Sequence, residues 1–204
     1  MKITALKQQV KNPERVSVFV DDKYVFSLSL SELIKYKVTP NDELSDAELK
    51  KFKKLSEDGK LTARALEWVL NRPRSHREFR DYMYRKKADH KLIEKLTQEF
   101  CDKKYLDEVK FGQWLIELRI RAGKSNRAIS AELRAKGLDR ELIDQLLDEQ
   151  GSGEEQRLKQ LIAKKQNLSR YKNDPLKLKQ YLAGQGFSYD LIKSALTTKA
   201  INED

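Results

Sequence analysis

The stretch LNRPRSHREFRDYMYRKK at residues 70–87 returns about 50 positions later as IRAGKSNRAISAELRAKG at residues 120–137. When Ser75 is aligned with Ser125, the apolar residues of the first copy fall on apolar residues of the second. A third copy fits when Asp174 takes the same position. Recurrence of one pattern at a nearly constant period indicates a repeat protein, in which neighbouring units bury their apolar faces against one another.

Each copy predicts three short helices. The second helix has a favourable N-cap in every copy, namely Ser75, Ser125 or Asp174, the last followed by Pro175. In two copies this helix ends at a glycine suited to a left-handed C-cap, Gly137 and Gly186, whereas the first copy has Lys87 there. Each helix has only two or three apolar positions per face, so we expect three helices to pack together and the units to stack.

The first 30 residues are the part of the sequence with strand character. The segments RVSVFVDD and KYVFSLSL flank an Asp-Asp-Lys turn and predict a β-hairpin, to which KITALKQQ adds a third strand. From Ser31 the apolar period changes to that of a helix, and a short helix is expected before Pro40. Ser45 and Glu48 form a capping box that begins a helix expected to run to Gly59.

These patterns predict a mainly α fold: three tandem three-helix repeat modules in an elongated curved array, preceded by a small N-terminal β-hairpin or three-stranded sheet with short helices. The expected domains are the N-terminal β-hairpin with helices at 1–59, module 1 at 60–107, module 2 at 108–150 and module 3 at 154–199. Gly151, Ser152 and Gly153 form an expected hinge before module 3.

The composition limits the class of binding partner and the cellular compartment. Of 204 residues, 36% are charged and the formal net charge is +10, which favours a polyanionic partner, nucleic acid first and acidic protein surfaces second. The single cysteine, Cys101, excludes an internal disulfide and is expected to be a small packing residue. The N-terminus lacks the apolar core of a signal peptide and no stretch approaches a membrane span, so we expect a cytoplasmic protein without a membrane partner.

Basic residues gather where the first and second helices of each module are expected to meet. If the modules stack with similar geometry, these clusters form a basic edge suited to an extended anionic partner. The alternative is that these clusters are ordinary solvated helix ends, where a cation interacts favourably with the negative C-terminal end of the helix dipole. The candidate partner- and DNA-binding residues are Arg72, Arg74, Arg77, Arg80, Tyr84, Arg119, Arg121, Lys124, Arg127, Arg134 and Lys172.

Nothing in the sequence indicates an enzyme. His76 and His90 have no Cys or acidic partner at metal-ligand spacing, so no metal site is expected. The segment RAGKS at 121–125 ends like a phosphate-binding loop but lacks its earlier glycine and the preceding strand. We therefore expect no catalytic residue, no cofactor and no small-molecule substrate.

Several motifs in order resemble the RecX regulators of the bacterial RecA recombinase. They are an Arg-Pro-Arg-Ser turn at 72–75, a Tyr-Leu-Asp-Glu entry leading to Phe111, a Gly-Lys-Ser loop at 123–125, and a helix end Glu-Leu-Arg-Ala-Lys-Gly at 132–137. The resemblance covers residues 60–198, and the N-terminal hairpin resembles the extension of longer members. Many members end the second helix of module 1 with Lys-Gly, whereas this chain has Lys86 and Lys87.

The resemblance implies a non-enzymatic protein of DNA repair, homologous recombination and the SOS response. Such a protein binds the RecA–single-stranded DNA filament, follows its groove, and modulates, mostly by inhibition, strand exchange and ATP hydrolysis. The partners expected are the RecA filament and single-stranded DNA, with double-stranded DNA as a further candidate, and the protein is expected to be a monomer.

Two other functions stay open at this point. One is a stand-alone DNA-binding protein of helix-turn-helix-like modules, for which module 2 offers Asn126, Arg127, Ser130 and Arg134 on a candidate recognition helix. The other is an RNA-binding helical repeat, which a net positive charge alone does not separate from the first two.

Overall fold

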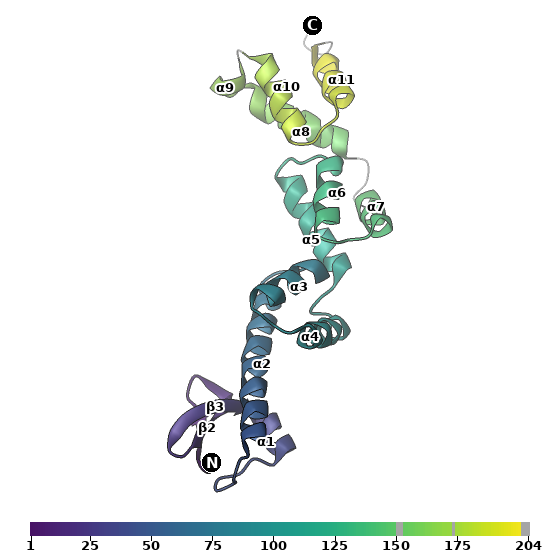
Figure 1. Cartoon of the computed structure of the whole chain (residues 1–204). Helices are drawn as coiled ribbons and strands as arrows, with labels where there is room; N and C mark the ends of the chain where they lie inside the picture. Colours follow the sequence, from purple (N-terminus) through teal and green to yellow (C-terminus); the bar gives the residue numbers. More distant parts are fainter. Residues whose placement is uncertain (150–152, 173, 201–204) are drawn as a thin grey trace. The chain divides into compact units, whose positions relative to one another are not determined.

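The structure is a computed structural model that describes residues 1–149, 153–172 and 174–200. Its strands are β1 (Ile3–Gln9), β2 (Asn12–Val20) and β3 (Lys23–Ser29). Its helices are α1 (Leu30–Tyr36), α2 (Asp46–Leu70), α3 (His76–Arg85), α4 (His90–Asp102), α5 (Glu108–Arg121), α6 (Asn126–Ala135), α7 (Arg140–Glu149), α8 (Glu154–Gln166), α9 (Ser169–Lys172), α10 (Pro175–Gly184) and α11 (Tyr189–Ala200). The prediction of a mainly helical fold behind a small N-terminal sheet is confirmed (Figure 1).

The residue contacts group the chain into two compact units. Unit 1 contains Met1–Arg72 and Tyr82–Glu99, and unit 2 contains Pro73–Asp81 and Phe100–Asp204. The expected division into a head and three modules stays a prediction. Two residues of the expected hinge, Gly151 and Ser152, lie outside the described residues.

The three strands form one antiparallel sheet in the order β1-β2-β3, so the third strand is confirmed. The hairpin turn between β2 and β3 is made by Asp21 and Asp22, whose φ angles are 48° and 63°. Two consecutive residues with positive φ are typical of the tight turns that match the twist of a hairpin, and Asp tolerates this conformation. The Asp-Asp-Lys segment therefore makes the turn expected from the sequence.

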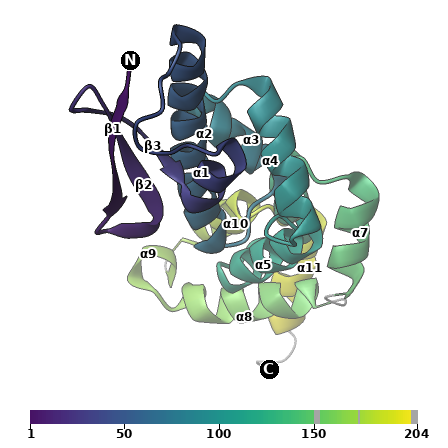
Figure 2. The same cartoon turned by 90° about the horizontal axis from the view of Figure 1, so that it is seen from below.

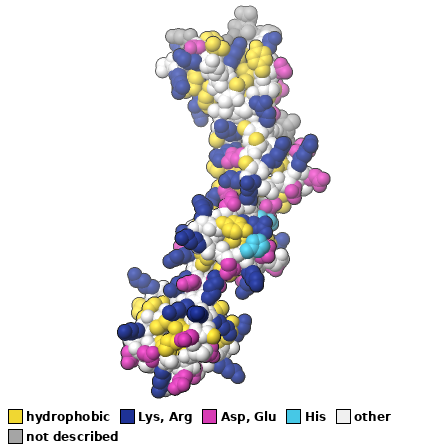
Figure 3. All heavy atoms as spheres, viewed as in Figure 1, with side chains coloured by type: hydrophobic (Ala, Val, Ile, Leu, Met, Phe, Trp, Pro, Cys, Tyr) yellow, Lys and Arg dark blue, Asp and Glu magenta, His cyan; other side chains and the backbone are white. Residues whose placement is uncertain are grey.

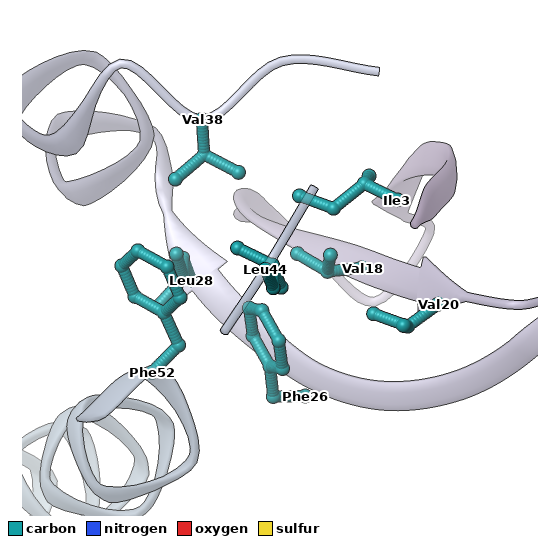
Figure 4. Packing of buried hydrophobic residues seen from close by; sticks show 8 residues of the cluster. All are labelled: Ile3, Val18, Val20, Phe26, Leu28, Val38, Leu44 and Phe52. Atoms are coloured by element: carbon teal, nitrogen blue, oxygen red, sulfur yellow. The ribbon is translucent and has the colours of Figure 1, made fainter. Parts of the chain in front are cut away.

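One face of the sheet is covered by α1 and by the first half of α2 (Figure 2). The core between them contains Ile3, Val18, Val20, Phe26, Leu28, Val38, Leu44 and Phe52, all less than one tenth exposed. Figure 4 shows that Phe52 reaches from α2 toward Phe26 and Leu28 on the sheet, and the rings of Phe26 and Phe52 stack at 5.6 Å. Burial of alternate strand residues against a helix gives unit 1 its own hydrophobic core.

The helix expected to end at Gly59 continues without interruption to Leu70, so the predicted stop is wrong. Gly59 has an ordinary helical conformation, and its missing side chain serves another purpose. A Cβ atom built there would lie 2.8 Å from Nη1 of Arg15, a residue of β2. The glycine thus allows the buried arginine to approach the helix backbone, a close approach that sequence periodicity does not reveal.

Capping residues set most helix starts as the sequence predicts. Ser45 and Glu48 form the expected capping box of α2, and Asp174 caps α10 with Pro175 at its first position. The short helix α1 begins one residue earlier than expected, because Ser29 and not Ser31 accepts the hydrogen bond from the Glu32 amide. Both hydroxyls were available, and only the backbone conformation distinguishes them.

Unit 2 contains two three-helix cores. The first is built from α5, α6 and α7 around Phe111, Ile116, Ile129, Leu133, Leu138, Ile143 and Leu146, and the second from α8, α10 and α11 around Leu158, Ile162, Leu178, Leu182, Phe187 and Ile192. Corresponding residues of the two repeats, such as Leu133 and Leu182, are both fully buried. The repeat therefore reflects equivalent places in two similar cores.

The ends of the second helices lie against the second helix of the preceding repeat in a repeated joint. Gly186, with φ of +99°, follows α10 and lies against the first turn of α6, where Arg127 Nε donates to its carbonyl oxygen at 3.0 Å. Gly137, with φ of +93°, follows α6 and lies against the first turn of α3, so that a Cβ atom would be 3.0 Å from Cβ of Arg77. The same contact thus joins successive repeats, and both sides of each joint belong to unit 2.

Candidate nucleic-acid interface

The residues expected to bind the partner divide by exposure. Six cations are exposed: Arg77, Arg80, Arg121, Arg127, Arg134 and Lys172. Four are partly buried: Arg72, Arg74, Arg119 and Lys124. On the face shown in Figure 3, Lys and Arg side chains are spread over the surface among Asp and Glu side chains.

Arg119 is held by an internal partner. Its Nε and Nη2 atoms donate to the two carboxylate oxygens of Glu132, each at 2.6 Å, so α5 and α6 are joined by a two-pronged ion pair. The hydrogen bonds from Arg119 lower the pKa of the Glu132 carboxyl, and those to Glu132 raise the pKa of Arg119. A guanidinium that already has two charge-assisted hydrogen bonds is a poorer phosphate ligand than a free one.

Arg77 and Arg127 both lie at the repeated joint. Arg77 covers Gly137, and Arg127 donates to the carbonyl of Gly186. Lys136 adds an ion pair across the first joint, with its Nζ 2.7 Å from Oε1 of Glu78. Charge reversal at these arginines would alter packing between repeats as well as surface charge, so they do not report on charge alone.

A smaller group of cations keeps its charge available to a partner. Arg121 pairs with Glu117 one helical turn away at 3.1 Å, but both side chains are more than half exposed, so the pair contributes little. Arg134 donates to the Ser130 hydroxyl, and no carboxylate of the described residues pairs with it. We call Arg80, Arg121, Arg134 and Lys172 the exposed cation set.

The aromatic residues near the first basic cluster have different roles. Trp68 on α2 stacks on Tyr82 with ring centres 4.3 Å apart and planes within 8°, so Trp68 acts as a packing residue. Tyr84 is 53% exposed, so its ring is accessible to a partner. Arg72 and Arg74 are partly buried and each takes part in an interaction within the chain.

The structure brings together one cluster that sequence spacing missed. The Sγ atom of Cys101 lies 3.2 Å from Nε2 of His76, whose Nδ1 lies 3.4 Å from Oε1 of Glu108. These residues come from the end of α4 and the starts of α3 and α5, so their separations along the chain carry no metal-ligand or catalytic signature. Only knowledge of the helix packing would have found them.

The electrostatics of this cluster oppose nucleophilic chemistry. Burial raises the pKa of the Cys101 thiol, and the carboxylates of Asp102, Glu108 and Asp107 raise it further. A reactive cysteine needs the opposite, a thiolate stabilised by nearby positive charge. Cys101 is therefore a protonated thiol hydrogen-bonded to an imidazole.

The described residues offer neither a metal site nor a membrane span. Among them, no group of three or more His, Cys, Asp or Glu side chains is placed to hold a metal ion. None of the described helices is long and apolar enough to cross a bilayer.

The chain is similar to known proteins along almost all of its length. Residues 1–45 match the family model described as the regulatory protein RecX N-terminal domain, and residues 107–147 match that described as RecX, second three-helix domain. The regulatory protein RecX of Listeria welshimeri is 31% identical over 208 residues, covering 100% of this chain and 77% of that protein. The regulatory protein RecX of Bacillus subtilis is 30% identical, covering 95% of this chain and 75% of that protein.

Two solved structures share the fold. A crystal structure of regulatory protein RecX superposes with a TM-score of 0.70 over 95% of this chain and 98% of the other, at 22% identity. The crystal structure of RecX from Lactobacillus salivarius gives a TM-score of 0.59 over 71% of this chain and 97% of the other, at 20% identity. The sequence relationship over nearly the full chain, together with this fold, shows that the chain belongs to the RecX family of regulatory proteins.

Proposed function

We propose that this protein binds the RecA–single-stranded DNA filament and modulates, mostly by inhibition, its recombinase and ATPase activities. Membership of the RecX family is the observation that carries the proposal. The net charge of +10 supports an anionic partner. In this proposal the protein acts by binding and not by catalysis, and it works in the cytoplasm, where the filament forms.

The exposed cation set supplies the DNA contacts in this mechanism. Each Lys or Arg that neutralises a phosphate of single-stranded DNA releases bound counterions, so the logarithm of the affinity falls by about 0.7 per contact for each unit of log salt. The repeated joints hold successive repeats of unit 2 in a defined relation, which suits a partner that is itself repetitive.

The stand-alone helix-turn-helix alternative is disfavoured by the contacts of α6, its candidate recognition helix. A recognition helix reads base edges with the residues of its N-terminal turns. Here the side-chain Oδ1 of Asn126 accepts from Nη2 of Arg157, and Nε of Arg127 donates to the carbonyl oxygen of Gly186. Ser130 is buried. Three of the four residues named for base reading are thus occupied by packing within the chain.

The test is ATP hydrolysis by a RecA recombinase on single-stranded DNA, with this protein added at increasing substoichiometric ratios. We expect inhibition at well below one copy per recombinase protomer, because one bound copy affects several protomers of a filament. No inhibition, combined with tight binding to naked DNA at the same salt concentration, would favour the stand-alone DNA-binding function. A strong preference for folded RNA would favour the RNA-binding function.

A charge-reversal pair tests the cation set separately from the family assignment. The variant Arg80→Glu, Arg121→Glu, Lys172→Glu avoids the joints, and the control Lys23→Glu, Lys50→Glu, Arg140→Glu makes the same change in net charge at other exposed cations. We expect the first variant to inhibit the recombinase only weakly. The slope of its log affinity for single-stranded DNA against log salt concentration should be shallower by about 0.7 for each phosphate that is no longer neutralised. Equal inhibition by both variants would show that total charge, and not this set, sets the affinity.

A further inference from the structure

A cleft of about 600 Å³ opens in unit 1 between the sheet, α2 and α4. Its walls include Arg15 of β2, Leu55 and Gly59 of α2, and Leu92 and Lys95 of α4, and every lining residue belongs to unit 1. The lining residues run from Leu55 to Ala63 on α2 and from Lys91 to Glu99 on α4, eight positions in each helix. At about 1.5 Å of rise per residue, the cleft is roughly 12 Å long. That length accommodates three or four residues of an extended chain at about 3.3 Å each.

Arg15 lines this cleft and has no carboxylate partner among the described residues. The residue is only 8% exposed. Its Nε donates to Oγ of Ser27 at 3.3 Å, and its Nη2 donates to the carbonyl oxygens of Ser27 at 2.8 Å and Ser56 at 3.4 Å. All of these acceptors are neutral, so the buried positive charge is uncompensated by an ion pair, which is unusual and costly.

Nη1 is the end of Arg15 that remains for a ligand. None of the hydrogen bonds of Arg15 within the described residues uses it, and it lies beside Gly59, where a Cβ atom would approach to 2.8 Å. Because Gly59 has no side chain, Nη1 itself occupies the place that a Cβ atom would need. A buried guanidinium that lines an open cleft, with one nitrogen that makes no hydrogen bond within the described residues, is a site for a single anionic group.

The other charged residues of the lining limit the class of anionic ligand that the cleft can bind. Asp58 and Asp89 are both held by Nζ of Lys54, at 2.9 and 2.8 Å. Glu32 accepts from the backbone amide of Ser29 in the cap of α1. These acidic groups are satisfied in place, but they still repel a ligand with many negative charges.

The rim is mixed in charge. Lys91 and Lys95 are exposed one turn apart on α4, while Glu14 is exposed on β2. Glu99 also lines the cleft and has an interaction of its own. A polyanion such as nucleic acid would bring many charges against these carboxylates, whereas a peptide with one carboxylate brings a single charge, which Arg15 offsets.

We propose that this cleft docks a short extended segment of a partner protein that places one carboxylate on Nη1 of Arg15 and apolar side chains on Leu55 and Leu92. The carboxylate supplies the missing counter-charge of the buried guanidinium. The aliphatic residues of α2 and α4 supply the apolar contact, and the mixed rim selects against polyanions. This site lies outside the exposed cation set, and it is independent of the proposed action on the recombinase.

The test is a titration of the ¹⁵N-labelled full chain with the peptide acetyl-Ala-Leu-Glu-Leu-Ala-amide, followed by amide chemical shifts. We expect saturable shifts at Gly59, Leu92 and neighbouring residues. The peptide with Gln in place of Glu should bind at least about tenfold more weakly, because it loses the charge-assisted hydrogen bond. Equal binding of the Glu and Gln peptides, or no saturation at millimolar concentrations, would overturn the proposal.

Two variants and two other probes complete the experiment. Arg15→Gln should lower the affinity for the Glu peptide to that for the Gln peptide. Gly59→Ala should have the same effect without destabilising α2, because alanine favours the helix. Lys23→Ala, at the hairpin tip, should leave binding unchanged. If Gly59→Ala binds the peptide as tightly as the unchanged protein does, Nη1 is not the contact. Saturable shifts of the same amides with inorganic phosphate or a ten-residue oligothymidylate, and not with the peptide, would assign the cleft to another ligand and refute peptide docking.

Discussion

The joint between the repeats predicts that Gly186→Ala is strongly destabilising, whereas Gly184→Ala, two residues earlier, is not. Gly186 has a φ of +99°, and a left-handed conformation costs a residue with a Cβ atom roughly 1–2 kcal/mol. The new methyl group would also lie 2.6 Å from Cβ of Ala128 and close to the Ser125 hydroxyl, and such overpacking typically costs about 1–3 kcal/mol. The expected loss in the free energy of unfolding is therefore about 2–5 kcal/mol.

Gly184 is the matched control because a Cβ atom there meets nothing within 4 Å and the residue is helical. Replacing it by alanine should be neutral or should stabilise by up to about 1 kcal/mol. Gly123→Ala separates the two costs, since its φ is +75° but the atoms nearest to the new methyl group belong to the flexible side chain of Leu161, at 3.2 Å. That variant should lose mainly the conformational part, about 1–2 kcal/mol.

The assay is urea unfolding followed by circular dichroism, with hydrogen exchange of α10 to locate the opening. Gly186→Ala should unfold at the lowest urea concentration and should increase exchange in both α10 and the first turn of α6. If it is as stable as Gly184→Ala, the contact of Gly186 with α6 does not hold the repeats together. If it matches Gly123→Ala, only the backbone conformation matters and the joint packing is not tight.

Three further results are expected from the same structure. Arg119 lowers the pKa of Glu132 from its ordinary 4.5, so the pair stabilises the fold above that pH and this stability is lost as the pH falls through the folded-state pKa. Glu132→Gln should cost about 1 kcal/mol at pH 7 by urea unfolding, and a difference in unfolding free energy that does not shrink as the pH falls below 4.5 would contradict the ion pair. Burial and the Glu108 carboxylate raise the pKa of Cys101, so its thiol should react with a disulfide reagent more slowly at pH 7 than free cysteine does. Glu108→Gln should speed this reaction, and an unchanged rate would argue against the charge effect. Lys87 has a φ of +60°, so Lys87→Gly should raise the free energy of unfolding by about 0.5–1 kcal/mol, and thermal melting that shows destabilisation would refute this reading of the helix end.

Much of the fold follows from short-range patterns in the sequence. The hairpin turn, the cap at Ser45, the cap at Asp174 and the stops at Gly137 and Gly186 are all made within a few residues of the chain. Their physical causes are local, because a hydroxyl or carboxylate satisfies a nearby amide and glycine adopts a positive φ without a steric penalty. The apolar period of the repeats likewise predicted which residues are buried in the cores of unit 2.

The interactions that separate structural from available charges are set by packing over long distances in the chain. Arg119 and Arg121 look alike in sequence, yet one is held by Glu132 from the next helix and the other remains exposed. The close approach of Arg15 to Gly59 is likewise a contact between segments far apart in the chain, since Arg15 belongs to β2 and Gly59 to α2. Periodicity and capping carry no information about such partners, because a side-chain contact between distant segments exists only once the helices and strands have packed.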